Sequence, residues 1–531
     1  MLMTWRYLIS LCLIQFFSMI FNTVPVKKPQ MSAFDLSYNN YFTCDMGELI
    51  PAFVLPVMPS DRIQYAPTFQ VRFAPMLNPV FADIYAKVEC FFVPYRLLWD
   101  SWKPYITGIS QSGMPSGTPT KIPTVVTTSF VAGAALSSSQ LDGIRLADFF
   151  GAKGFYRLLK GATITDSYKG FEFSCFPFRA YTLIWNEYYR DEFVDSPLQI
   201  GVNDGRTGDL FVGSNSTIID NYGFFHRRWQ KDYFTTATPT PQLGTDASGV
   251  QVSISGAEVS DLKGFFSIAQ FRVANALQRF LERTNVGGGR YNEFILAHFG
   301  CMPTDATIQR PEFLGSVTAP VQVSAVTQTS QAIADNNTKS NTLGAQGGQA
   351  SAVGTNMCFR RSFQEYGVIL GLFSVFPKPV YSDGVSRYLT CGVKGSRFDF
   401  GFPEFAGVGD QQIDKTELAT WLYAKNYGTG FGYQQRYAEF KFMNDEVHGD
   451  FSVVNSGLAQ YTFSRFFISD SGTLWTPSLN SSFLECTPRA DCFVLKSVSG
   501  STASTVNQCW VQLRNNVKVI RALPKFSTPT L

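Results

Sequence analysis

Carboxylates are the residues that could most readily do chemistry in this chain. Glu187, Asp191 and Glu192 lie close together in the sequence, and two carboxyl groups held in one cleft can hydrolyse a glycosidic bond. Closeness along the chain does not establish such a cleft. Charges on the solvent side of a helix are a much commoner reason for this pattern, so we predict no catalytic pair from it.

The other reactive residue types lack the spacing that catalysis or metal binding needs. His226, His298 and His448 are far apart and form no HExxH motif, and the ten cysteines include no CxxC pair, so zinc ligation is not indicated. Gly287–Gly289 follows an expected helix and lacks the lysine of a phosphate-binding loop. The sequence therefore predicts no catalytic residue, no cofactor, no metal site and no enzyme activity.

Composition indicates a globular protein whose surface is largely covered by partners. Of the 531 residues, 45% are hydrophobic, 15% are aromatic and only 16% are charged; aromatic residues are typical of strands and of large interfaces. The net charge of +3 is too small for a chain that neutralises many phosphates by itself. Any contact with nucleic acid should therefore be local, or should be shared with a separate basic protein.

Basic residues gather near both ends of the chain, with Lys27 and Lys28 close to the start. Near the finish, four residues are candidate contacts for single-stranded DNA: Arg514, Lys518, Arg521 and Lys525. Ordinary solvated charge is the alternative interpretation of both groups.

The element most in need of a packing partner is an aromatic helix expected over residues 176–193. Phe178, Tyr181, Trp185 and Tyr188 recur at spacings of three and four, which places them on one face of a helix. Such a stripe must press against something large. Two interpretations remain open: a helix that faces the core of its own subunit, or an element at a junction between subunits.

Short strands broken by prolines dominate the rest. Period-two alternation or continuous apolar character predicts strands at 52–59, 68–75, 83–94, 365–376 and 387–393, and segment 509–525 is expected to contain a final strand followed by a tail broken by proline. This rhythm favours a sandwich or barrel over a parallel sheet, which would need a helix between strands. Two further helices are expected at 266–283 and 291–299, the first with Phe266, Val273 and Phe280 on one face.

Three polar segments rich in Gly, Ser, Thr and Pro are candidate surface loops, at 107–140, 196–262 and 327–357. Residues 1–33 are expected to form an N-terminal extension. Its apolar run Leu8–Phe21 is too short to span a bilayer comfortably, because that takes about 20 residues. It is either a targeting segment or an over-extended gene start, with Met19 as the true first residue.

Six blocks of sequence resemble the major capsid protein of the Microviridae, the small icosahedral phages with single-stranded DNA, and most closely the gokushovirus-like branch. The central block is FRAYTLIWNEYYRD at 178–191. The others, in the family's order, are 34–63 with MGELIP, 72–108 with FFVPYRLLWDSW, 290–315, VTQTSQ at 326–331 and the tail RALPKFSTPTL. The match is weaker at 109–175, 196–262 and 394–480.

The resemblance implies a mainly β fold, an eight-stranded antiparallel viral jelly-roll barrel with long inserted loops and a few helices, forming one domain over 34–531. It implies self-assembly in the host bacterial cytoplasm into the T=1 icosahedral shell of a virion around a circular single-stranded DNA genome. It also implies a small basic DNA-binding protein, a scaffolding protein and a host-cell surface receptor as partners. Segment 196–262 is our first candidate for the loop that meets the host, and 107–140 is the second.

In a shell subunit, exposed aromatic and arginine side chains are candidate anchors between subunits. The candidates here are Trp99, Trp102, Trp185, Tyr188, Tyr189 and Arg190; burial in the subunit's own core is the alternative for each. Two other functions use the same fold. One is a secreted jelly-roll carbohydrate-binding protein with 1–21 as its signal, and the other is a glycoside hydrolase. Either should run as a small oligomer, whereas a shell protein should form particles.

Overall fold

The structure is a computed structural model. It describes residues 30–108, 122–126, 138–154, 172–200, 202, 223–241, 268–329, 344–393, 397–407, 409–420, 430–454, 456–467, 476–494 and 507–525. The expectations for residues 1–29, and for most of the candidate loop 107–140, lie outside the described residues.

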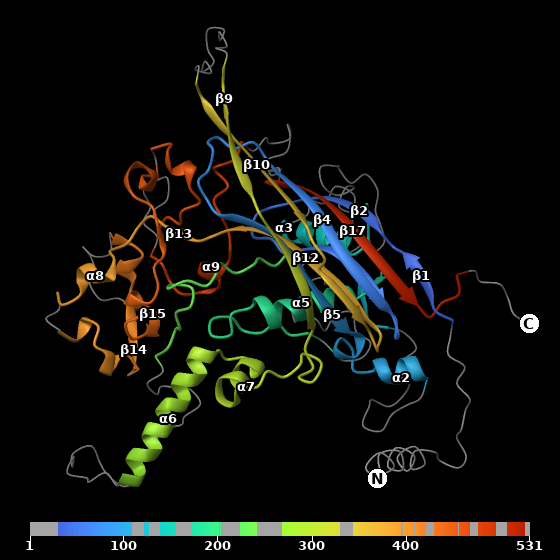
Figure 1. The fold of residues 1–531 in the computed structure, drawn as a ribbon, viewed down its shortest axis with the longest axis horizontal. Helices are drawn as coiled ribbons and strands as arrows, with labels where there is room; N and C mark the ends of the chain where they lie inside the picture. Colours follow the sequence, from blue (N-terminus) through green and yellow to red (C-terminus); the bar gives the residue numbers. More distant parts are fainter. Residues whose placement is uncertain are drawn as a thin grey trace, which may run out of the picture.

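Two antiparallel sheets form the body (Figure 1). In the larger sheet the order is β1–β17–β4–β10–β9, with β2 also on β17 and β11 also on β4. Its strands are β1 (Ser32–Asp35), β2 (Tyr38–Cys44), β4 (Arg62–Phe73), β9 (Gln322–Thr327), β10 (Gln346–Thr355), β11 (Phe359–Ser362) and β17 (Cys509–Arg521). The β9–β10 hairpin rises above the rest of the molecule.

The second sheet has the order β3–β12–β5–β8, again with every pair antiparallel. Its strands are β3 (Ile50–Val57), β12 (Gly367–Pro377), β5 (Ile84–Pro94) and β8 (Glu312–Pro320). Together with β2, β17, β4 and β10 these make the eight strands of an antiparallel jelly roll, so the predicted fold class is confirmed.

Side chains between the sheets explain the sequence patterns. In β4, Phe69, Val71 and Phe73 point inward while Gln70 and Arg72 point out, which is the period-two alternation of a half-buried strand. Every residue of β12 is buried, because the larger sheet covers one face and helices cover the other. Apolar residues are therefore needed on both faces of β12, and the sequence shows a continuous apolar run.

The connection from β5 to β8 supplies those helices: α2 (Trp102–Thr107), α3 (Ser138–Phe149) and α5 (Phe176–Ile184), which runs into a π-helical turn at Trp185–Tyr189. Strand β6 (Thr124–Val126) precedes α3 and strand β7 (Glu172–Ser174) precedes α5, and the two pair as a small antiparallel sheet. The connection ends in α6 (Ile268–Gly287) and α7 (Tyr291–Phe299), which lie at the lower left of Figure 1.

The connection from β12 to β17 builds a smaller lobe with its own apolar cluster. It contains β13 (Val380–Tyr381), α8 (Arg387–Thr390), β14 (Asp410–Asp414), β15 (Gly430–Gln435), β16 (Asp445–Glu446), α9 (Ser481–Leu484) and several single 3₁₀ turns. Tyr233 and Phe234 from the preceding connection are buried in this cluster, so the two long connections share one core.

Three segments differ from expectation. The segment predicted as a strand at 387–393 begins with the short helix α8. Residues 223–241, inside the candidate loop 196–262, bury Trp229 and Tyr233 and make bridges to other segments. The candidate loop 327–357 contains β10, where only small side chains such as Ala350 and Ala352 face the core. The composition of β10 resembles that of a loop, but the segment forms a strand because it pairs with β4.

Gly47 joins three distant segments at the turn before β3. Its N–H donates to the carbonyl of Val375 at 2.7 Å, and its own carbonyl accepts from the N–H of Arg227 at 2.7 Å. Its φ is +87°, and a Cβ at this position would overlap the carbonyl oxygen of Cys486. Only glycine allows the chain to make this close approach.

We predict that Gly47→Ala lowers the free energy of unfolding by about 3 kcal/mol, because it adds overpacking against backbone to the cost of a positive φ. Urea unfolding of the purified chain measures this. Gly108→Ala separates the two effects, since Gly108 has φ +69° but open space around it, and it should cost about 1 kcal/mol. Gly407→Ala, also in open space, should be neutral. Equal losses at Gly47 and Gly108 would contradict the role of the close contact.

Candidate interaction surfaces

Three of the six candidate interface residues are buried in the subunit itself. Trp99 is fully buried, and Trp185 and Tyr189 expose 7% and 8% of their surface; all three belong to the cluster between the second sheet and its helices. The Tyr189 hydroxyl donates to Glu89 at 2.7 Å. These side chains leave little surface for another subunit to cover.

The other three candidates, Trp102, Tyr188 and Arg190, are half-buried. Trp102 packs edge-on against Tyr95, with ring centroids 4.9 Å apart. The Tyr188 hydroxyl donates to the carbonyl of Pro311 at 2.5 Å, and Arg190 donates to the carbonyl of Asp195 at 2.7 Å. Each keeps an exposed portion.

The carboxylates near the aromatic helix are used in local structure. Asp191 accepts backbone N–H groups from Phe193 and Val194, and Glu192 faces Arg290 at 3.5 Å. The nearby Glu89 accepts from Arg227 at 2.6 Å. Burial acts to raise the pKa of Glu89, but the charges of Arg227 and Lys87 outweigh it and the pKa is lowered. These groups form ion pairs and turn caps.

A second surface is the solvent side of the larger sheet, which the candidate DNA contacts help to form. Side chains alternate along β17, so that Trp510, Arg514 and Lys518 point outward while Val511, Leu513 and Val517 point into the core. Trp510 lies opposite Arg72 of β4 and Thr43 of β2, and Gln512 lies opposite Tyr41. We call the part of this surface formed by β2, β4 and β17 the outer sheet face; its cationic and aromatic members are Tyr41, Arg62, Arg72, Trp510, Arg514 and Lys518.

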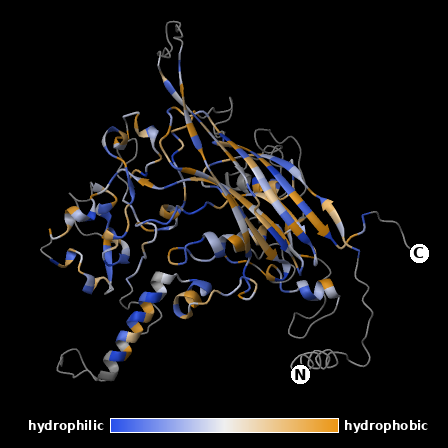
Figure 2. Ribbon diagram, in the orientation of Figure 1, coloured by the Kyte–Doolittle hydropathy of each residue, from blue (hydrophilic) through white to orange (hydrophobic). Residues whose placement is uncertain are grey.

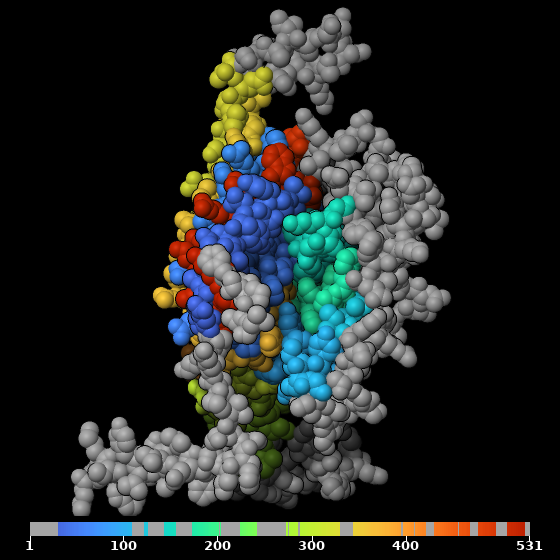
Figure 3. Space-filling model, turned by 90° about the vertical axis from the view of Figure 1, so that its right-hand side faces the viewer, coloured from blue at the N-terminus to red at the C-terminus, as the bar shows by residue number. Residues whose placement is uncertain are grey.

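The outer sheet face combines exposed rings with cations. Tyr41 and Trp510 expose 67% and 43% of their surface. Arg514 and Lys518 lie four and eight residues further along β17 than Trp510, on the same face. Figure 3 shows this side of the molecule, where the N-terminal strands (blue) and β17 (red) adjoin.

The remaining two candidate DNA contacts differ from each other. Arg521 donates to the buried carboxylate of Asp61 at 2.9 Å and to the carbonyl of Pro56, so it ties the end of β17 to the loop after β3. Lys525 is exposed beyond the strand.

Sequence reasoning missed Tyr41, Arg62, Arg72 and Trp510. Alternation within β4 and β17 places Arg72 and Trp510 on the outer faces of their strands. The sequence does not reveal that those strands are neighbours.

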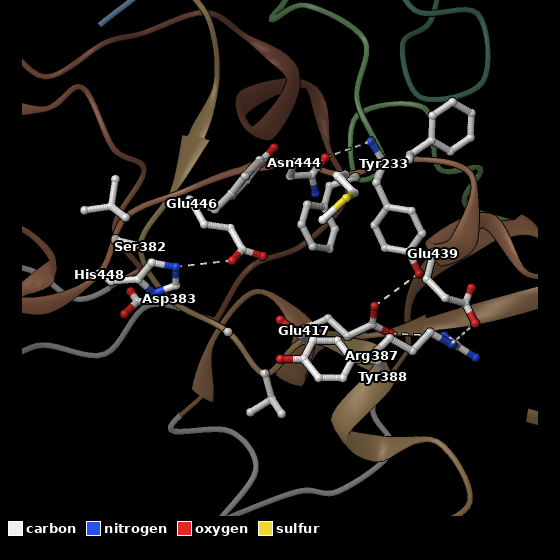
Figure 4. A pocket seen from close by; sticks show the side chains of 18 of the residues that line it. Tyr233, Ser382, Asp383, Arg387, Tyr388, Glu417, Glu439, Asn444, Glu446 and His448 are labelled. Carbon is white, nitrogen blue, oxygen red and sulfur yellow. Dashed lines mark hydrogen bonds and ion pairs between the residues drawn. The ribbon is translucent and has the colours of Figure 1, made fainter. Parts of the chain in front are cut away.

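A third surface is a pocket of about 280 Å³ in the smaller lobe (Figure 4). Four carboxyl groups line it, and Arg387 is the arginine among its lining residues. We call it the acidic pocket; its carboxyl groups are Asp383, Glu417, Glu439 and Glu446.

Arg387 lies 3.1 Å from Glu417 and 3.4 Å from Glu439. Burial raises the pKa of the Glu417 carboxyl to about 7, against the opposing effect of the Arg387 guanidinium. The Tyr233 hydroxyl also donates to Glu417, at 3.1 Å. The pocket therefore holds more acidic groups than its single arginine can pair.

Large apolar side chains surround the acidic pocket and face solvent. Tyr388, Phe440, Phe442 and Met443 expose 69%, 61%, 53% and 97% of their surface. Contiguous exposed apolar surface of this kind usually marks a place where another molecule binds.

Chemistry of other kinds is not indicated in the described parts of the chain. They contain no group of three or more His, Cys, Asp or Glu residues placed to hold a metal, and their cysteines are all free thiols. Among the same residues, no helix is both long and apolar enough to cross a membrane.

Comparison with known proteins agrees with this arrangement of a β barrel with large interaction surfaces. The family model described as "Capsid protein (F protein)" matches residues 22–261 and 259–531, which is almost the whole chain.

Three curated proteins, each named Capsid protein VP1, are similar over most of their length. That of Bdellovibrio phage phiMH2K is 26% identical, over 88% of this chain and 90% of its own. That of Chlamydia phage 1 is 26% identical, over 88% and 91%, and that of Spiroplasma virus 4 is 25% identical, over 92% and 93%. The resemblance to Microviridae capsid proteins is thus confirmed, and the chain belongs to the capsid protein (F protein) family.

Proposed function

We propose that this capsid protein, a component of the virion, is the major shell protein of its phage, and that many copies close into a T=1 icosahedral shell around a circular single-stranded DNA genome. The jelly roll supplies a rigid body, and its long connections supply the surfaces through which copies meet. Heterologous contacts repeated around rotation axes can close such a shell although each contact is small.

We place the DNA on the outer sheet face. Proteins that bind single strands without reading sequence combine cations that follow the backbone with aromatic rings on which bases stack. The outer sheet face offers both, with Trp510 and Tyr41 exposed beside Arg72, Arg514 and Lys518. This pairing of rings and cations on one flat surface is the observation that carries the proposal.

The small net charge sets a limit on this contact. Four cations on the outer sheet face and a net charge of +3 for the chain cannot balance a packaged genome by themselves. We therefore retain a small basic DNA-binding protein as a partner in the shell, with a scaffolding protein during assembly in the bacterial cytoplasm. Segments 196–262 and 107–140 remain our candidates for the contact with a host receptor, and Trp102, Tyr188 and Arg190 for contacts between subunits.

We expect the full chain, produced with the phage's scaffolding protein, to sediment as particles of megadalton size that protect circular single-stranded DNA from nuclease. Gradient sedimentation and electron microscopy measure the particles, and nuclease digestion measures the protection. A preparation that remains monomeric or forms only small oligomers under every ionic condition would contradict the proposal and favour the carbohydrate-binding or hydrolase alternatives.

We predict that the double variant Arg514→Ala, Lys518→Ala weakens binding of the unassembled chain to a single-stranded oligonucleotide. The slope of log affinity against log salt should become less steep by about 0.7 for each cation removed. Trp510→Ala should cost about 1–3 kcal/mol of binding free energy through lost stacking. Fluorescence anisotropy at several salt concentrations measures both effects.

Matched controls lie on other surfaces of the same chain. Lys441 is exposed in the smaller lobe, and Tyr291 on α7 exposes 67% of its surface. Lys441→Ala and Tyr291→Ala should leave affinity and salt slope unchanged. If they reduce binding as much as the sheet variants do, the DNA does not bind specifically to the outer sheet face.

A further inference from the structure

The described side chains of helix α6 lack the packing that a helix of its length normally has. The helix contains 20 residues, and none of its described side chains is buried. Its packing partner is α7: Phe280 contacts Phe294 and His298 with ring centroids 5.8 and 4.5 Å apart, and Thr284 hydrogen-bonds to His298 at 3.0 Å. Those contacts all lie toward the C-terminal end of α6, so its first half projects (Figure 1).

We expect another surface to pack against the exposed apolar side of this projecting helix. Most helical stability in proteins comes from packing of an amphipathic face, and not from intrinsic propensity. Val273 exposes 61% of its surface and Phe280 exposes 43%. These two residues are seven apart and therefore lie on one side of α6. Figure 2 shows apolar and polar residues alternating along the helix.

Beside this apolar strip runs a basic one. Arg272, Arg279 and Arg283 are separated by seven and four residues, and at 3.6 residues per turn these spacings bring them within a narrow arc of the helix surface. Each of the three is exposed. The projecting surface of α6 is therefore apolar along one strip and cationic along the next.

The acidic pocket and its rim have the complementary character. The pocket carries four carboxyl groups against one arginine, and its rim exposes Tyr388, Phe440, Phe442 and Met443. None of the described side chains of α6 lines the pocket in the single chain. Each surface offers the charge that the other lacks, and both expose apolar side chains.

Building on the proposed shell function, we propose that α6 of one subunit docks on the acidic pocket of a second copy, with its arginines facing the pocket carboxylates and Val273 and Phe280 against the aromatic rim. Because the two surfaces are different patches of the same chain, the contact is heterologous, and each copy both gives a helix and receives one. Such contacts can generate closed rings about a rotation axis.

Glu446 is the most exposed of the four acidic side chains in the pocket, so its substitution is the best test of the docking. Its side chain is 53% exposed and faces His448 at 3.4 Å, so replacing it should leave the fold intact. Arg279→Glu and Glu446→Arg should each reduce the yield of particles at least about tenfold, because each brings like charges together. The double variant Arg279→Glu, Glu446→Arg restores opposite charges and should recover the yield to within about threefold of the unmodified chain.

The measurement is gradient sedimentation of the full chain produced with the scaffolding protein, with urea unfolding of the unassembled chain to verify that each variant folds. Lys153→Glu and Asp450→Arg are matched controls, because both residues are exposed and lie outside the pocket and α6. They should assemble as the unmodified chain does.

Particles in normal yield from both single variants, or a double variant no better than the singles, would overturn the docking and leave the shell function standing. Complete shells that lack DNA, obtained from Arg279→Glu, would assign the arginines to nucleic acid and also overturn it. Failure of the unmodified chain to form any particle would reject the shell function itself, together with the docking that depends on it.

Discussion

The fold depends on one pairing between the two ends of the chain. Strand β17 lies between β2 and β4 and pairs with β4 from Cys509 opposite Phe73 to Ile520 opposite Arg62. Its outward residues form the outer sheet face, and its inward residues Val511, Leu513, Val517 and Val519 complete the core between the sheets. Without β17 the larger sheet would divide into separate pieces. The barrel therefore closes only when the last part of the chain has been added, and contacts of such high sequence separation fold slowly.

The closed barrel carries two very long connections, 95–311 and 378–508, whose described parts pack against it. They are joined to the barrel and to each other through backbone contacts: Gly47 to Val375 and Arg227, and the N–H of Cys486 to the carbonyl of Arg227 at 2.8 Å. Glycine at position 47 permits this junction, because a side chain there would displace Cys486. The barrel therefore holds the connections in place. Both surfaces that expose apolar side chains beside charged ones, α6 and the acidic pocket, belong to these connections.

Much of the frame could be predicted from sequence, because local patterns determine it. Alternation in β4 and the apolar run of β12 report which faces are buried, and the spacing of Phe178, Tyr181 and Trp185 predicted a helix with one aromatic face. That this face packs on its own core, and not on another subunit, is known only from the structure. The surfaces could not be predicted in the same way. Trp510 and Tyr41 come together because β17 pairs with β2, more than four hundred residues away in the sequence. Trp99 was a candidate interface residue from its type alone, and only the structure shows that it is buried. Strand β10 was hidden because its inward positions hold only small residues, Ala350, Ala352 and Gly354, where the barrel leaves no room for larger ones.

The weak charge of the outer sheet face is consistent with the way a shell would hold its genome. With about 0.7 ion released per contacted phosphate, the four cations Arg62, Arg72, Arg514 and Lys518 would give a single subunit a salt slope of only about 3 on single-stranded DNA. An isolated subunit would therefore hold DNA weakly in a salt-rich cytoplasm. Copies fixed side by side in a shell present the same cations at high effective concentration, so that the combined affinity rises without any new contact. Weak binding by each copy would then make encapsidation depend on assembly, because only neighbouring subunits together would retain the strand.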